Sequence, residues 1–267
     1  MSTELRRIAV LGHDVRVSVR HGTRPGRPLI LCNGIGASLD LLQPFVDALP
    51  PPIEVVRFDV PGVGGSSQPR IPYNFAAMAY FLGKLLDRLG YAEVDMLGIS
   101  WGGGLAQQFA FQNPKRCTHL VLVSTATGSI MVPASPLILR KMITPRRYRD
   151  PDYAVAIAAE LYGGRLRDEP ELARRLLHKE SRIGSTRGYL LQLTAGAGWT
   201  SLPFLPLIRQ PTLVMSGRDD PIIPSVNARI MQHLLPNARL YLFDDGHLGL
   251  VTKANELAPE VARFLDP

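Results

Sequence analysis

Short apolar runs alternate along the chain with longer segments in which apolar residues recur every three or four positions. Short runs bounded by turn residues are typical of buried strands, and the longer spacing is typical of helices with one buried face. The predicted strands cover residues 8–12, 14–20, 28–34, 53–60, 94–100, 119–126, 211–217 and 239–245, the first two as a hairpin. The predicted helices cover residues 39–50, 75–90, 103–114, 225–236 and 256–265.

Strands and helices in alternation indicate an α/β fold, with a mostly parallel, eight-stranded sheet covered by helices on both faces. This alternation stops between residues 127 and 207. There, helical patterns follow one another with Gly and Pro between them, at 135–148, 152–164, 169–182 and 188–199. We therefore expect two parts of one core, 1–126 and 208–267, and a helical lid, 127–207, inserted over one end of the sheet.

Composition narrows the possible classes of protein. The 267 residues are 46% hydrophobic and 20% charged, which favours a large packed core. The net charge is +7, but the densest basic segments also contain acids and lack regularly interleaved aromatics, so nucleic-acid binding is not predicted. Two cysteines without a CxxC pattern fit a reducing compartment. The sequence shows neither a signal peptide nor a transmembrane run, and we expect a cytoplasmic protein.

The segment "GISWGG" places one serine, Ser100, where a predicted strand turns into a helix. It matches G-x-S-x-G, the nucleophile elbow, in the strand–turn–helix context that this motif requires. Gly98 and Gly102 flank the serine, and a Cβ at either position is expected to crowd the neighbouring strand and helix. Alternatively, Ser100 is an ordinary helix N-cap.

A serine nucleophile needs a base, and the base needs an acid that orients it. His247 follows the last predicted strand in "FDDGHLGL", and the acids of "SGRDDPIIP" follow the strand before it. Asp220 is favoured over Asp219 because Gly217, Asp220 and Pro224 fit the pattern G-x-x-D-x-x-x-P. The order Ser, Asp, His is that of α/β-hydrolases.

The loop "LILCNGIGASLDL" is the candidate second half of an oxyanion hole. The backbone N–H of Trp101, just after the nucleophile, and that of Ile35 in this loop are the expected donors. Gly34 and Gly36 on either side of Ile35 leave room for a substrate oxygen.

Over essentially its whole length the chain resembles the α/β-hydrolase fold family. "RFDVPGVGGSSQP" resembles the family's D-x-x-G-x-G-x-S loop, here Asp59, Gly62, Gly64 and Ser66, to which we assign a structural role. Asn33 stands where many members have His before the glycine, and we expect this departure to change how the oxyanion loop is braced.

Several segments, "RFDVPGVGGS", "GISWGGGLAQQFA", "LYGG", "AGAGWTS" and "DDGHLGL", together resemble intracellular depolymerases of medium-chain-length polyhydroxyalkanoates. This resemblance implies a serine hydrolase that acts on a polyester of 3-hydroxy fatty acids stored as cytoplasmic granules. Ser100, Asp220 and His247 would then be catalytic. The triad mechanism needs no metal or organic cofactor. An exposed apolar patch on the lid is a candidate surface for docking on such a granule. Trp101, Trp199 and Asn33 are candidate substrate-binding residues, together with the segment "SIMVPASPLIL".

Other functions remain compatible with these motifs. A small-molecule carboxylesterase, a lactonase or a carbon–carbon bond hydrolase has the same triad and differs only in the lid pocket. A non-catalytic ligand receptor on the same fold is an alternative of another class. A haloalkane dehalogenase is disfavoured because it needs an aspartate nucleophile where this chain has Ser100.

Overall fold

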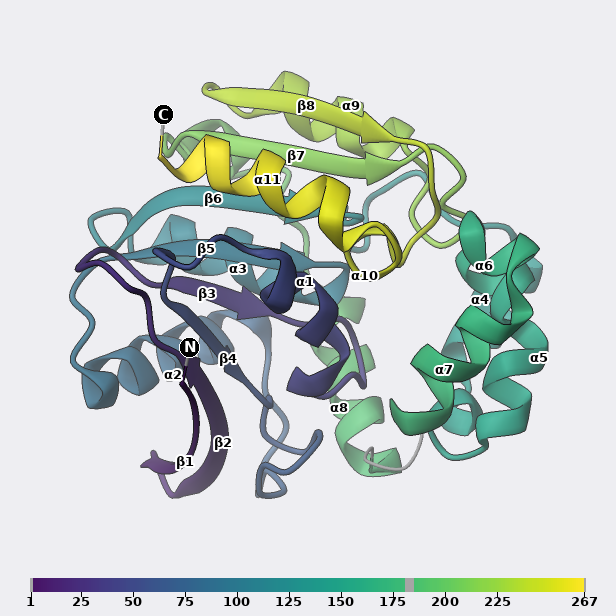
Figure 1. Cartoon of the computed structure of the whole chain (residues 1–267), viewed down its shortest axis with the longest axis horizontal. Helices are drawn as coiled ribbons and strands as arrows, with labels where there is room; N and C mark the ends of the chain where they lie inside the picture. The colour runs from purple at the N-terminus through teal and green to yellow at the C-terminus, as the bar shows by residue number, and fades with distance from the viewer. Residues whose placement is uncertain (1, 181–184, 267) are drawn as a thin grey trace.

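The computed structural model describes residues 2–180 and 185–266. Its strands form one sheet in the order β1-β2-β4-β3-β5-β6-β7-β8 (Figure 1). β1 and β2 form an antiparallel hairpin, β2 pairs antiparallel with β4, and the remaining neighbours are parallel. The predicted fold class is therefore confirmed. The strands are β1 (Thr3–Val10), β2 (His13–Arg20), β3 (Leu29–Cys32), β4 (Val55–Phe58), β5 (Val94–Ile99), β6 (Cys117–Val123), β7 (Thr212–Gly217) and β8 (Ala238–Phe243).

Helices cover both faces of the sheet because successive side chains of each strand point to opposite sides. On β3, Ile30 packs into the cluster beneath α2, α3 and α9, whereas Leu29 and Leu31 pack into the cluster beneath α1 and α11. The covering helices are α1 (Gln43–Ala48), α2 (Phe75–Leu89), α3 (Trp101–Gln112), α9 (Val226–Leu234) and α11 (Ala254–Leu265).

Among its described residues, the chain between β6 and β7 forms helices joined by loops and no strand of the sheet. It contains α4 (Pro136–Ile143), the 3₁₀ helix η2 (Pro145–Tyr148), α5 (Pro151–Tyr162), α6 (Arg165–Asp168), α7 (Pro170–Glu180), α8 (Thr186–Ala197) and the 3₁₀ helix η3 (Leu205–Leu207). Helices α4 to α7 lie beyond the carboxyl ends of the parallel strands, and α8 lies apart from them, closer to the core (Figure 1). An isolated antiparallel bridge joins Gly128 to Thr200.

All four helices predicted between residues 127 and 207 differ from their predicted bounds. Those predicted over 152–164 and 188–199 are found as Pro151–Tyr162 and Thr186–Ala197, shifted by one or two residues at each end. The single helix predicted over 135–148 is wrong: α4 ends at Ile143, and Thr144 is extended, with φ −80° and ψ 132°. Pro145 explains the break, because a residue before proline is sterically driven out of the helical region. The helix predicted over 169–182 is found as Pro170–Glu180, and residues 181 and 182 lie outside the described residues.

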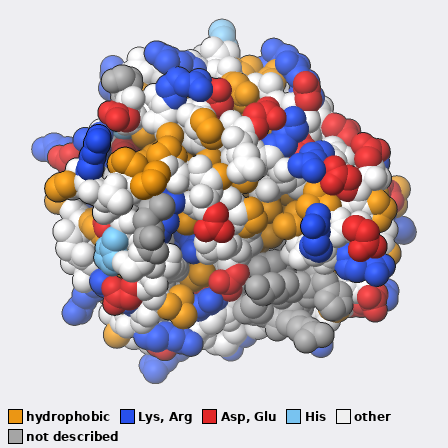
Figure 2. Space-filling model, viewed as in Figure 1, with side chains coloured by type: hydrophobic (Ala, Val, Ile, Leu, Met, Phe, Trp, Pro, Cys, Tyr) orange, Lys and Arg blue, Asp and Glu red, His pale blue; other side chains and the backbone are white. Residues whose placement is uncertain are grey.

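The surface does not gather one sign of charge on the face drawn in Figure 2, where basic and acidic side chains are interspersed. A continuous basic stripe would be expected of a nucleic-acid site. Within residues 2–180 and 185–266, no helix combines the length and apolar character needed to cross a bilayer.

Helix α8 approaches the loop after β4 more closely than side chains would permit. A Cβ added to Gly188 would lie 1.8 Å from the carbonyl oxygen of Gly62. The hydroxyl of Ser185, the N-cap of α8, donates to the same carbonyl at 3.0 Å. The predicted loop of Asp59 to Ser66 therefore provides the surface on which α8 rests.

Substituting glycines of α8 is expected to have opposite effects at two positions. Gly188→Ala should lower the free energy of unfolding by about 1–3 kcal/mol, because the added methyl group overlaps Gly62. Gly196→Ala meets nothing within 4 Å and should raise it by up to about 1 kcal/mol through helix propensity. Urea unfolding of both variants measures the difference, and equal midpoints would contradict the close packing.

Candidate active site

Ser100 lies in a sharp turn between β5 and α3, with φ 54° and ψ −121°. This backbone conformation is strained for a residue with a side chain. A Cβ on Gly98 would lie 2.3 Å from the carbonyl oxygen of Gly102, and one on Gly102 would lie 2.0 Å from that of Cys32. The predicted crowding at both glycines is confirmed. Glycine at these two positions lets β5 and α3 cross closely and lifts the serine above the sheet.

His247 and Asp220 form a buried pair on the loops after β8 and β7. Nδ1 of His247 lies 2.8 Å from Oδ2 of Asp220, and their side chains are only 5% and 0% exposed. The other carboxylate oxygen accepts from the N–H groups of Ile222 and Ile223, each at 2.9 Å. With both oxygens engaged, the carboxylate fixes the orientation of the imidazole.

Asp219 points elsewhere. Its carboxylate accepts from the N–H of Gly164 at 2.8 Å and from the guanidinium of Arg167 at 2.9 Å. Partial burial raises the pKa of Asp219, but these two donors outweigh burial and bring that pKa below its usual value. Of the two acids that the sequence offered, the structure brings Asp220 to the histidine.

The segment "LYGG" braces the histidine loop from the lid side. The N–H of His247 donates to the carbonyl of Tyr162 at 2.8 Å, and the two rings are near-parallel, with centroids 6.5 Å apart. A Cβ on Gly246 would lie 2.0 Å from that same carbonyl. The last turn of α5 thus holds the backbone on which the imidazole stands.

The candidate oxyanion loop after β3 is braced by its own asparagine. The side chain of Asn33 accepts from the N–H of Gly34 at 2.8 Å and donates to the carbonyl of Ser38. Asn33 is 6% exposed, so its amide is engaged within the loop although it also contacts the cavity beside Ser100. The structure thus shows how Asn33 holds this loop, and whether this differs from bracing by a histidine stays a prediction.

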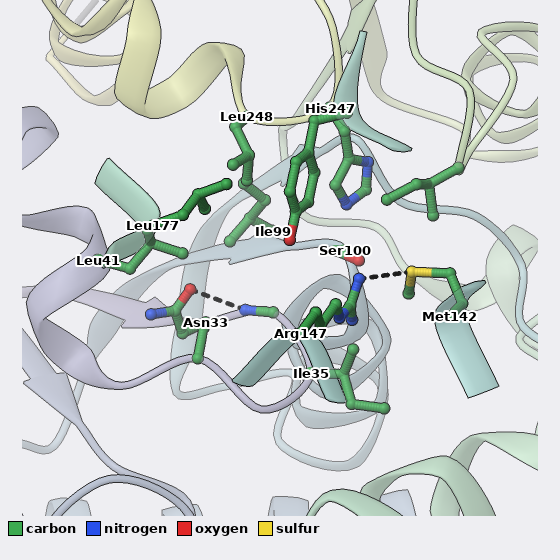
Figure 3. Close-up of a pocket in the computed structure, with 14 residues that line it drawn as sticks. Asn33, Ile35, Leu41, Ile99, Ser100, Met142, Arg147, Leu177, His247 and Leu248 are labelled. Atoms are coloured by element: carbon green, nitrogen blue, oxygen red, sulfur yellow. Dashed lines mark hydrogen bonds between the residues drawn. The ribbon is translucent and has the colours of Figure 1, made fainter. Parts of the chain in front are cut away.

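Two cavities meet at Ser100. The smaller, about 40 Å³, lies beside the imidazole of His247 (Figure 3). The larger, about 450 Å³, is predominantly apolar and extends toward the lid. Ile35, Ser100, Met142 and Ile222 line both cavities. Ser100, the nucleophile candidate, therefore lies between a small cavity that His247 also lines and a large, mostly apolar cavity.

The two tryptophans line the larger cavity. The rings of Trp101 and Trp199 flank Phe75, with centroid distances of 4.7 and 4.6 Å. The indole N–H of Trp199 donates to Oε1 of Gln108 at 2.6 Å, which fixes the ring against the core. From the segment "SIMVPASPLIL", the lining residues are Ser129, Met131, Pro133, Ala134 and Leu139.

Among the cavity-lining residues that the sequence did not single out are Phe75, Arg147 and Gln192. Phe75 joins the two tryptophans, Arg147 lines the smaller cavity, and Gln192 lines the larger one. Gln192 is 1% exposed on α8, and an amide between Leu191 and Leu193 was the one local signal for it. Arg147, at 3% exposure, is one of several arginines in its segment, and sequence alone does not distinguish it.

The loop of Asp59 lies behind the site. Its carboxylate accepts from the N–H groups of Leu39 and Gly65, each at 2.7 Å, and the Ser66 hydroxyl donates to its carbonyl. Burial raises the pKa of Asp59, partly offset by these two N–H donors. Asp59 contacts neither cavity, consistent with the structural role assigned to it. In the described part of the chain, no cluster of three or more His, Cys, Asp and Glu side chains has the arrangement of a metal site.

The alpha/beta hydrolase fold family model matches residues 27–254, and the chain belongs to this family. The predicted membership is confirmed. The chain is 50% identical, over 93% of its length and 89% of the relative's, to a poly(3-hydroxyalkanoate) depolymerase of Ectopseudomonas oleovorans. It is 26% identical, over 89% of its length and 88% of the relative's, to 3-oxoadipate enol-lactonase 2 of Acinetobacter baylyi.

Solved structures agree on the fold. An enol-lactonase from Burkholderia xenovorans has a TM-score of 0.83 at 23% identity, with 98% of this chain and all of that chain covered. An esterase from Exiguobacterium antarcticum has a TM-score of 0.84 at 19% identity, with 98% of this chain and 99% of that chain covered. Family and relatives together identify an ester-hydrolysing enzyme, as the sequence predicted.

The two neighbouring acids are expected to differ sharply in their effect on catalysis. Asp220→Asn should lower kcat for a soluble p-nitrophenyl ester about 10³–10⁴-fold, because the orientation and tautomer of His247 depend on this carboxylate. Asp219→Asn weakens a half-exposed ion pair and should change kcat less than about threefold. Similar losses in both variants would contradict the assignment of Asp220.

Proposed function

We propose that this chain is a serine hydrolase that cleaves the ester bonds of medium-chain-length poly(3-hydroxyalkanoate) to 3-hydroxy acids. One observation carries the proposal: Ser100 stands between the buried His247–Asp220 pair and a large apolar cavity. The 50% identity to a protein named as a poly(3-hydroxyalkanoate) depolymerase supports the substrate class.

In the first half of the reaction, Nε2 of His247 takes the hydroxyl proton of Ser100, whose oxygen attacks the ester carbonyl carbon. Asp220 stabilises the imidazolium that forms. The tetrahedral intermediate then collapses, the carbon–oxygen bond of the ester breaks, and His247 returns the proton to the departing alkoxide. The products of this half are an acyl-serine and the free hydroxyl end of the leaving chain.

In the second half, His247 takes a proton from water, and the hydroxide attacks the acyl-serine. Collapse of the second intermediate releases the 3-hydroxy acid and returns the proton to Ser100. In both halves, the N–H groups of Ile35 and Trp101 bind the oxyanion, and each such donor is typically worth about 100- to 1,000-fold in rate.

The two cavities suggest how the ester is oriented. The alcohol must leave next to the imidazole, and His247 lines only the smaller cavity. The acyl part would then occupy the larger one, where aromatic and aliphatic side chains match a medium-length alkyl group. Trp101 and Trp199 contribute to this lining, whereas Asn33 borders the side of the leaving alcohol.

The proposed lid, residues 127–207, carries exposed apolar side chains beside the mouth of the larger cavity. Ile130, Leu137, Leu139 and Ile143 are 59%, 46%, 43% and 64% exposed, and Leu139 and Ile143 also line the cavity. Exposed apolar side chains continuous with a binding cavity are typical of a contact with an apolar partner. We propose that they rest on the surface of a polyester storage granule in the cytoplasm.

Clearing of a polymer latex tests the proposed reaction. Wild-type protein should lower the turbidity of a medium-chain poly(3-hydroxyalkanoate) latex and release 3-hydroxy acids, whereas Ser100→Ala should do neither. Cleavage of p-nitrophenyl esters or lactones without any clearing would reject the polyester and favour a small-molecule carboxylesterase or lactonase. Failure of a fluorophosphonate to label Ser100 would favour a non-catalytic receptor.

Charged residues introduced on the lid surface are expected to impair docking on the polymer while leaving hydrolysis of a soluble ester nearly unchanged. Ile130→Glu with Leu137→Glu, at two exposed positions that line neither cavity, is expected to reduce latex clearing about tenfold or more, because a charged surface does not settle on an apolar polymer. The kcat for a short soluble ester should change little. Leu5→Glu with Leu11→Glu is the matched control, since these residues are also exposed but lie on the β1–β2 hairpin. Equal clearing by both double variants would reject granule docking through the lid.

A further inference from the structure

We infer that Gln192, on helix α8, is a positioning residue that holds the oxyanion hole in its working shape. The inference rests on the proposed serine-hydrolase chemistry and assigns part of it to the lid. Its basis is a pair of buried hydrogen bonds. Oε1 of Gln192 accepts from the N–H of Gly36 at 2.7 Å, and its main-chain carbonyl accepts from the indole N–H of Trp101 at 2.8 Å.

The loop that carries Ile35 is a tight turn whose central peptide can adopt two orientations. The N–H of Ala37 donates to the carbonyl of Gly34 at 3.2 Å, Ile35 keeps a negative φ, and Gly36 has φ +72°. These values define a type II turn. A type I turn differs by about 150° in one ψ and about 170° in the next φ, which turns the central peptide over.

Glycine at position 36 permits both turn types, because glycine adopts either sign of φ without steric cost. The turn's own residues therefore do not select one form. Gln192 does: its oxygen accepts from the Gly36 N–H only in the observed form. In the other form, the carbonyl of Ile35 would face this oxygen, and two acceptors would oppose each other without a proton between them. The peptide that turns over joins Ile35 to Gly36, whereas the Ile35 N–H belongs to the preceding peptide. Gln192 therefore acts on this donor through the shape of the turn that carries it.

The second contact reaches the other half of the oxyanion hole. Trp101 carries the N–H that follows the nucleophile, and its side chain is held by the Gln192 carbonyl. One residue of α8 thus touches both chain segments that supply the proposed donors. Helix α8 is itself fixed where Gly188 meets Gly62, so these contacts connect the lid to the core.

Gln192→Leu removes the side-chain acceptor with little change in volume. We expect kcat for a soluble ester to fall about tenfold to a hundredfold, less than for complete loss of one donor, while KM changes little. A medium-chain trifluoromethyl ketone, which forms an oxyanion on the serine, should bind more weakly by a similar factor. By NMR, the Gly36 amide hydrogen should exchange with solvent faster than in the wild type.

Gln210→Leu is the matched control. Gln210 is also buried, at 7% exposure, and donates to the carbonyl of Ala110 at 3.1 Å, away from both cavities. It should lower the melting temperature without lowering kcat or the affinity for the ketone. Equal kcat in wild type and Gln192→Leu would overturn the positioning role and leave the hydrolase intact. An inactive wild-type protein whose Ser100 resists fluorophosphonate would overturn both.

Discussion

The close crossing of β5 and α3 at Ser100 is the constraint on which the rest of the site depends. Gly98 and Gly102 permit this crossing, since a methyl group at either would overlap neighbouring backbone. The half-buried serine has a strained φ of 54°, and such a conformation typically costs about 1–3 kcal/mol. The surrounding packed sheet supplies the stabilisation that keeps this turn in place.

The other chemical groups are held from the lid side as well as from the core. The backbone of His247 is fixed by the carbonyl of Tyr162 at the end of α5, and the oxyanion turn is fixed by Gln192 on α8. The insertion between β6 and β7 therefore contacts both the loop of His247 and the turn of Ile35. Its two contacts act on opposite sides of Ser100, one on the base and one on the turn of Ile35.

The histidine–aspartate pair and the larger cavity differ in polarity. The His247–Asp220 pair is almost completely buried, and both oxygens of its carboxylate accept hydrogen bonds. Removing either side chain would leave a buried polar group without its partner, which is costly. The larger cavity, in contrast, is lined by rings and aliphatic side chains that offer few polar partners.

The sequence by itself determined the sheet, the order of its elements and the loops that hold Ser100, Asp220 and His247, because hydrophobic period and turn residues are local properties. The glycines of the elbow were also predictable, since the motif requires a close crossing. Only the tertiary structure decided the break of the helix at Thr144, the direction of Asp219 away from the histidine, and the contacts of Gln192 and Arg147. These depend on which distant segment lies opposite each side chain. Gly36 and Gln192 are far apart along the chain, and no local pattern in either segment reveals that they meet.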